Sequence, residues 1–126
     1  MRLLFVLLLT SLSLHSQNTI ESISYADYLN FDNSDDFIVI DVRTPEEHKI
    51  KRIKNSININ FYDEKFIDLF KVYEKDENIL IYCRSGRRSL EAVKNLSKKG
   101  FKNIYDLKGG ILALDKSLVD FDSLDD

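Results

Sequence analysis

The chain has 126 residues and a mass of 14.7 kDa, which is enough for one domain and not for two. Its 18 basic and 21 acidic side chains give a net charge of −3, which argues against a nucleic-acid-binding protein, since such proteins usually carry a basic surface. One cysteine excludes an intramolecular disulfide, and one cysteine with two histidines is too small a set for a typical zinc site, so we expect neither a metal nor a cofactor.

Residues 1–16 have the pattern of a secretory signal peptide. Arg2 supplies a positive charge, Leu3 to Leu14 are mostly apolar, and Ser16 is a small residue at a possible cleavage site. The alternative is a retained membrane anchor, but the apolar run is shorter than the roughly 20 residues that span a bilayer. We therefore expect an exported protein, periplasmic if its source is bacterial and otherwise secreted, without stable membrane insertion after cleavage.

The remaining chain, residues 17–126, alternates strand and helix patterns. Continuous apolar runs of strand length are typical of strands buried on both faces. Helical spacing of apolar residues marks the segments between them, with Ser24 and Ser89 as possible N-caps and Gly100 as a C-terminal stop. These patterns predict strands at 37–42, 56–60, 78–82 and 103–107, and helices at 25–30, 63–75, 89–99 and 111–118.

This alternation predicts a single α/β domain, with a mainly parallel central sheet flanked by helices. Its core spans about residues 22–118, and the acidic tail at 119–126 is expected to be frayed. The sequence does not predict an oligomeric state.

A cysteine at the end of a predicted buried strand is the candidate reactive residue. Cys83 follows strand 78–82 and precedes a short basic loop and a helix start. Ligands of parallel α/β folds bind at the carboxyl ends of strands, and the free N–H groups of a helix start attract anions and thiolates. We therefore predict a nucleophilic thiolate in an anion-binding loop rather than a buried apolar cysteine. The loop consists of Arg84, Ser85, Gly86, Arg87, Arg88 and Ser89.

The segment CRSGRRS at 83–89 resembles the active-site loop of single-domain rhodaneses, the thiosulfate sulfurtransferase family. Three further segments agree in order. VIDVRTPEE at 39–47 resembles the family motif DVR-x-P-x-E, IKNSINI at 53–59 resembles the end of its GHIPGAINI segment, and LKGGILA at 107–113 resembles its LxGGxxAW stretch. The family's Gly-His before the isoleucine is Lys51-Arg52 here, and its last aromatic is Leu114, departures that bear on substrate preference.

The resemblance implies that Cys83 takes a sulfane sulfur from thiosulfate or a similar anion, becomes a persulfide, and passes the sulfur to cyanide or a thiol. The loop N–H groups would hold the persulfide, and Arg84 and Arg88, with Arg87 as a third candidate, would attract the anionic donor. We interpret Asp41 and Arg43 as a structural ion pair that pins the turn after the first long strand. His48 is interpreted as a packing or surface residue and not as a general base.

Two alternatives of other classes stay open at this point. Cysteine phosphatases and arsenate reductases have a C-x5-R loop, whereas Cys83 and Arg88 form C-x4-R, a spacing that suits one sulfur atom better than a tetrahedral oxyanion. A non-catalytic sulfur carrier or sensor is the second alternative, and the intact cysteine and basic loop weigh against it.

Overall fold

The computed structural model describes residues 21–31, 34–114 and, for the backbone, 121–123. The predicted signal peptide at 1–16 lies outside these residues, as does the last part, 115–118, of the predicted final helix. Within the described segments, no helix has the length and apolar character needed to cross a membrane.

A parallel sheet of five strands forms the centre of the molecule. Neighbouring strands all run in the same direction, so the predicted mainly parallel α/β architecture is confirmed. The four predicted strands are present, and the edge strand β1 was not predicted. The order across the sheet is β1 (Glu21–Ile23), β6 (Asn103–Leu107), β5 (Asn78–Tyr82), β2 (Ile38–Asp41) and β4 (Ile57–Asn58).

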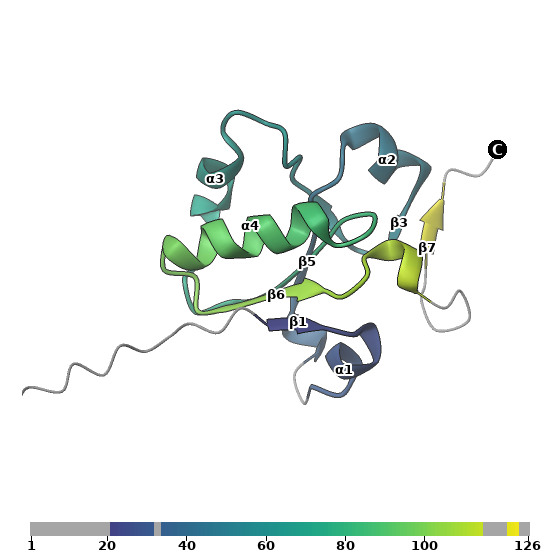
Figure 1. Cartoon of the computed structure of the whole chain (residues 1–126), viewed down its shortest axis with the longest axis horizontal. Coiled ribbons are helices and arrows are strands. Elements are labelled where there is room, and N and C mark those ends of the chain that lie inside the picture. The colour runs from purple at the N-terminus through teal and green to yellow at the C-terminus, as the bar shows by residue number, and fades with distance from the viewer. Residues whose placement is uncertain (1–20, 32–33, 115–120, 124–126) are drawn as a thin grey trace, which may run out of the picture.

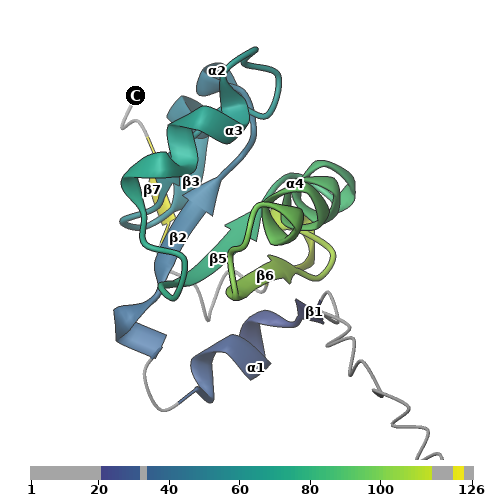
Figure 2. The same ribbon diagram turned by 90° about the vertical axis from the view of Figure 1, so that its left-hand side faces the viewer.

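Helices cover both faces of this sheet. Figures 1 and 2 place α4 on one face and α1 on the other, while α2 lies beyond the end of β2. The helical elements are α1 (Tyr25–Leu29), η1 (Ser34–Asp36), α2 (Pro45–Ile50), α3 (Phe66–Leu69), η2 (Phe70–Val72), α4 (Arg87–Lys98) and η3 (Ile111–Ala113).

The alternation of side chains along β5 divides the core into two clusters. Ile79 and Ile81 pack with residues of α3, η2 and α4 on one face, and Cys83 continues this series just beyond the strand. Leu80 and Tyr82 pack on the opposite face. Because successive residues of a strand point to opposite faces, the position of Cys83 directs its sulfur toward the start of α4.

Two predicted helices are shorter than expected. In place of a helix over 63–75, α3 is followed by one 3-10 turn, and the chain is extended again at Tyr73. No side chain caps the start of α3, and burial of Phe66 and Phe70 needs only one turn, whereas Leu69 is 42% exposed. The predicted final helix is reduced to η3 over its described part, because Leu114 is already extended.

The helix after the cysteine begins earlier than predicted. Gly86 is the N-cap of α4, and its φ of +105° is a left-handed conformation that favours glycine. Ser89 is therefore the third residue of the helix and not its N-cap, so the prediction for Ser89 was wrong. The predicted ending was correct, since α4 ends at Lys98 and Gly100 follows with φ +99°.

An unpredicted helix and ribbon complete the fold beside β2. Thr44 caps α2 in a capping box with Glu47, and Pro45 occupies the first turn. Strand β3 (Lys51–Ile53) follows directly and pairs antiparallel with β7 (Phe121–Ser123). Part of the tail that we expected to be frayed thus forms a strand.

Candidate active site

The sulfur of Cys83 lies at the centre of a tight backbone loop. The amide of Gly86 donates a hydrogen bond of 3.1 Å to Sγ, and the Ser89 hydroxyl lies 3.4 Å from it. Backbone amides of Ser85 and Ser89 also donate toward the sulfur. The side chain of Cys83 is 1% exposed. The sequence-predicted loop therefore does surround the cysteine with N–H donors.

These donors outweigh the effect of burial on ionisation. Removal of the thiol from water raises the pKa of Cys83, whereas the Ser89 hydroxyl and the amides of Ser89, Gly86 and Ser85 lower it. The net pKa of Cys83 lies below its usual range. The loop thus favours the thiolate, the form of cysteine that acts as a nucleophile.

A turn containing two glycines holds the cysteine loop from one side. Ile111 donates a backbone hydrogen bond of 2.9 Å to the carbonyl of Cys83, and Leu112 donates one of 3.1 Å to the carbonyl of Arg84. Gly110 makes this approach possible, because a Cβ at this position would lie 2.4 Å from the Arg84 carbonyl oxygen.

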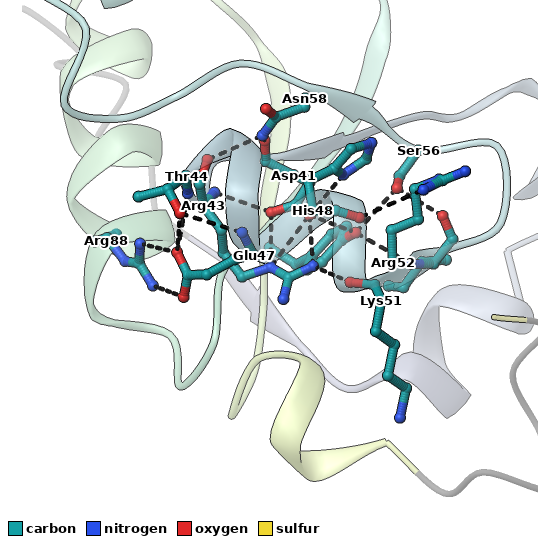
Figure 3. Close-up of polar contacts among 12 residues, drawn as sticks. Asp41, Arg43, Thr44, Glu47, His48, Lys51, Arg52, Ser56, Asn58 and Arg88 are labelled. Carbon is teal, nitrogen blue, oxygen red and sulfur yellow. Dashed lines mark hydrogen bonds and ion pairs between the residues drawn. The ribbon is translucent and has the colours of Figure 1, made fainter. Parts of the chain in front are cut away.

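The three arginines of the loop differ in their surroundings. Arg88 is buried and forms two hydrogen bonds with the carboxylate of Glu47, at 2.9 and 3.0 Å, as Figure 3 shows. Arg87 is exposed and donates to the Tyr62 hydroxyl at 3.3 Å. Arg84 is exposed, and its side chain forms no hydrogen bond or ion pair with another described residue. Arg84 is therefore the loop cation most available to an anion.

Glu47 is a site residue that our sequence analysis did not single out. Its hydrogen bonds with Arg88, and weaker ones with Thr44, lower its pKa to about 2. The same hydrogen bonds, which Arg88 donates to Glu47, raise the pKa of Arg88, and the nearby negative charge of Cys83 adds to this effect. The signal was present in the capping-box spacing of Thr44 and Glu47, which places the carboxylate at the start of a helix.

The predicted ion pair of Asp41 and Arg43 is present and belongs to a larger buried network. Asp41 is 0% exposed and accepts hydrogen bonds from Arg43 Nη2 at 2.7 Å and from the Tyr82 hydroxyl at 3.0 Å. His48 Nδ1 also lies 2.8 Å from Asp41, so His48 has a polar partner rather than a purely packing or surface role. Figure 3 shows this carboxylate between Arg43 and His48, where it fixes the turn after β2.

A cavity of about 280 Å³ lies beside the loop. Its cationic groups include Arg84, and its apolar part includes Ile50 and Leu112, which are 71% and 61% exposed. Within the described residues, no cluster of three His, Cys, Asp or Glu side chains could hold a metal ion. The residues that line the cavity are Arg43, Glu47, Ile50, Lys51, Arg84, Ile111 and Leu112.

The family model of the rhodanese-like domain matches residues 24–117, well over half of the chain. The chain belongs to the rhodanese family. It is 31% identical over 123 residues to a protein of Schizosaccharomyces pombe named putative thiosulfate sulfurtransferase, mitochondrial, a match that covers 83% of this chain and 87% of that protein. Among solved structures, a rhodanese-related protein of Thermoplasma volcanium is 38% identical, with a TM-score of 0.62 over 72% of this chain and 86% of that one.

Other relatives are longer proteins that contain a similar segment. The adenylyltransferase and sulfurtransferase UBA4 of Debaryomyces hansenii is 36% identical over 69% of this chain and 21% of its own length. The tRNA uridine(34) hydroxylase of Pelagibacter ubique is 38% identical over 73% of this chain and 31% of its own length. This rhodanese chain therefore spans between about a fifth and a third of these relatives, and their likeness concerns one domain.

Proposed function

We propose that the protein is a sulfurtransferase that moves a sulfane sulfur from thiosulfate, or a similar small sulfur anion, to a thiophilic acceptor through a persulfide on Cys83. The observation that carries this proposal is the buried sulfur within a ring of N–H donors. The similarity of nearly the full length to the putative thiosulfate sulfurtransferase of Schizosaccharomyces pombe supports the choice of donor.

The first step forms the persulfide. The Cys83 thiolate attacks the outer sulfur of thiosulfate, a new S–S bond forms at Sγ, and the sulfur–sulfur bond of thiosulfate breaks with its electron pair leaving on sulfite. Total charge is unchanged, and sulfite needs no proton to leave. This agrees with the position of His48, whose ring is bonded to Asp41 rather than directed at the cysteine.

The second step returns the enzyme to its starting state. Cyanide or a thiolate attacks the terminal sulfur of the persulfide, and the bonding pair returns to Cys83 Sγ as a thiolate. The amides that favour the Cys83 thiolate also favour this leaving group. In the donor step, exposed Arg84 supplies positive charge near the loop, whereas the charge of Arg88 is already shared with Glu47.

The spacing of the loop supports sulfur transfer over phosphate or arsenate chemistry. Gly86 caps α4 only three residues after Cys83, so its amide already bonds to the sulfur. The backbone amides of this short loop therefore point toward a single atom, the sulfur of Cys83. We propose that hydrolysis of aryl phosphates by the unaltered protein is negligible.

Intact-mass analysis tests the proposal. Incubation with thiosulfate should add the mass of one sulfur atom, and cyanide should then remove it with formation of thiocyanate. The Cys83→Ser variant should keep its circular dichroism spectrum and gain no sulfur, because a serine hydroxyl is not ionised near neutral pH. Sulfur uptake without turnover would instead favour a carrier or sensor, and substantial transfer by the serine variant would overturn the proposal.

A further inference from the structure

Asp106 is a buried acidic residue that the proposed reaction does not use directly. It lies on β6 and is 3% exposed. Its carboxylate accepts a hydrogen bond of 2.8 Å from Ser22, its neighbour across the strand pair with β1, and a second one from the Ser89 hydroxyl. Both partners are neutral hydroxyls, and burial raises the pKa of Asp106 in spite of them. An ionised Asp106 is therefore costly.

The hydroxyl of Ser89 joins this carboxyl group to the catalytic sulfur. Its oxygen bonds to Asp106 on one side and lies 3.4 Å from Cys83 Sγ and 3.2 Å from the Gly86 carbonyl oxygen on the other. A serine hydroxyl has one proton to donate. If the Ser89 hydroxyl donates this proton to an ionised Asp106, the serine presents only its oxygen lone pairs to the sulfur. The neutral thiol, which can donate to these lone pairs, is then favoured.

A protonated Asp106 has the opposite effect. Its carboxyl group donates to Ser89 Oγ, and the Ser89 hydroxyl is then free to donate to the sulfur or to the Gly86 carbonyl oxygen. The thiolate is favoured in this arrangement. The state of Asp106 thus decides which way the serine donates, although the carboxyl group itself does not touch the sulfur.

We propose that Asp106 is a positioning residue that sets the charge of Cys83 through Ser89, so that Asp106 is protonated when the sulfur is ionised. The exchange balances: the thiol proton passes to Ser89 Oγ while the Ser89 hydroxyl proton passes to the Asp106 carboxylate, and the total charge stays the same. The inference deepens the proposed function, since it takes Cys83 as the sulfur carrier.

The other charged groups near this relay belong to different partners. In the first turn of α4, the guanidinium of Arg88 is bonded to Glu47, although its positive charge also favours the Cys83 thiolate. Burial and, after it, the negative charge of Glu21 on β1 raise the pKa of Tyr105, which is the residue before Asp106 on β6. The titration of Cys83 is therefore expected to respond chiefly to Asp106 and Arg88.

The pH dependence of alkylation by iodoacetamide tests the relay without any sulfur donor. In Asp106→Asn, Ser22 donates to the amide oxygen, which turns the amide nitrogen toward Ser89 as a donor. The Ser89 hydroxyl then has the sulfur and the Gly86 carbonyl oxygen as its remaining acceptors. We expect the alkylation midpoint to fall by about one pH unit, so that the rate below both midpoints rises about tenfold.

The matched control is Asp36→Asn. It makes the same chemical change at an exposed residue of η1, which precedes β2 and thus lies at the other end of the sheet from Cys83. Its alkylation midpoint should equal that of the wild type. Equal midpoints for a folded Asp106→Asn and the wild type would overturn the proposal.

The wild-type protein provides a second measurement in case the variant does not fold. The carbon-13 shift of the Asp106 carboxyl group should be that of a protonated carboxyl group at the pH where Cys83 has become ionised. An ionised Asp106 beside an ionised Cys83 at this pH would refute the relay. A protonated Asp106 beside an ionised Cys83, without sulfur transfer, would refute the proposed function alone.

Discussion

The pair of Arg88 and Glu47 should make the stability of this rhodanese sensitive to acid. Two hydrogen bonds join the groups, and Arg88 is the main cause that the pKa of Glu47 falls from 4.5 to about 2. Because the folded-state pKa is lower than the unfolded one, the ionised carboxylate stabilises the fold above about pH 4.5. This stabilisation is lost as the pH falls through about 2.

The size of the effect follows from the two pKa values. The difference, 4.5 − 2, is about 2.5 units and corresponds to roughly 3 kcal/mol at about 1.4 kcal/mol per unit. The side chain of Glu47 is 31% exposed, so that solvent screens part of the attraction. We therefore expect the ionised Glu47 to contribute about 1–2 kcal/mol to the free energy of unfolding near neutral pH.

Urea unfolding of Glu47→Gln and wild type between pH 7 and pH 2 measures this contribution. The variant should be less stable by about 1–2 kcal/mol at pH 7, and the difference should shrink by half or more as the pH approaches 2. Glu46→Gln, at the exposed neighbouring position of α2, should differ little from wild type throughout. A difference for Glu47→Gln that does not depend on pH would refute the reasoning.

Three further predictions concern the loop, the glycine turn and the N-terminus. Arg84→Ala should raise the KM for thiosulfate about five- to tenfold in steady-state kinetics, and the effect should shrink at 1 M salt, where screening is strong; Lys98→Ala, at the far end of α4, should not change KM. Gly110→Ala should lower the free energy of unfolding in urea by about 2–4 kcal/mol and abolish most sulfur transfer, because its Cβ would meet the Arg84 carbonyl. Gly100 also has a positive φ, +99°, but it has space for a Cβ, so Gly100→Ala should lower the free energy of unfolding by about 1 kcal/mol and leave transfer intact. Export should remove about residues 1–16, which N-terminal sequencing of the protein from its native compartment would detect, and an uncut chain retained in the membrane would contradict it.

The fold was predictable where local pattern and burial agree. Strand β5 is an apolar run that is buried on both faces, and its bounds at Asn78 and Tyr82 were predicted correctly. Edge strand β1 was missed because Glu21–Ile23 has only one apolar residue, and its pairing with β6 depends on a partner more than 80 residues away. Short edge strands are stabilised by such distant partners and leave little local signal.

The start of α4 shows why the site was predicted only in part. The types of the loop residues, Gly86 among them, indicated an anion-binding loop. Sequence spacing alone placed the helix start at Ser89, since serine is a good N-cap. The structure uses the left-handed Gly86 as the cap, so that the Ser89 hydroxyl lies inside the first turn and faces the sulfur.

Contacts between segments that are distant in the sequence could not be predicted from local sequence patterns. Arg88 was predicted to attract a donor anion, yet its charge is shared with Glu47, 41 residues earlier in the chain. Likewise, nothing local marks Asp106 on β6 as a neighbour of Ser89. Both pairings arise because parallel strands bring the starts of α2 and α4 and the end of β6 to the same edge of the sheet.

The length of the cysteine loop explains how these parts act together at the sulfur. With Gly86 as the cap, Ser89 is the third residue of α4, and at this position the backbone amide of a helix has no partner within the helix. The amide of Ser89 is therefore free to donate to Cys83, and its side chain is placed between the sulfur and Asp106. One additional loop residue would rotate Ser89 by about 100° around the helix axis and separate these groups. The length of the loop between Cys83 and Ser89 is thus a requirement of this donor geometry.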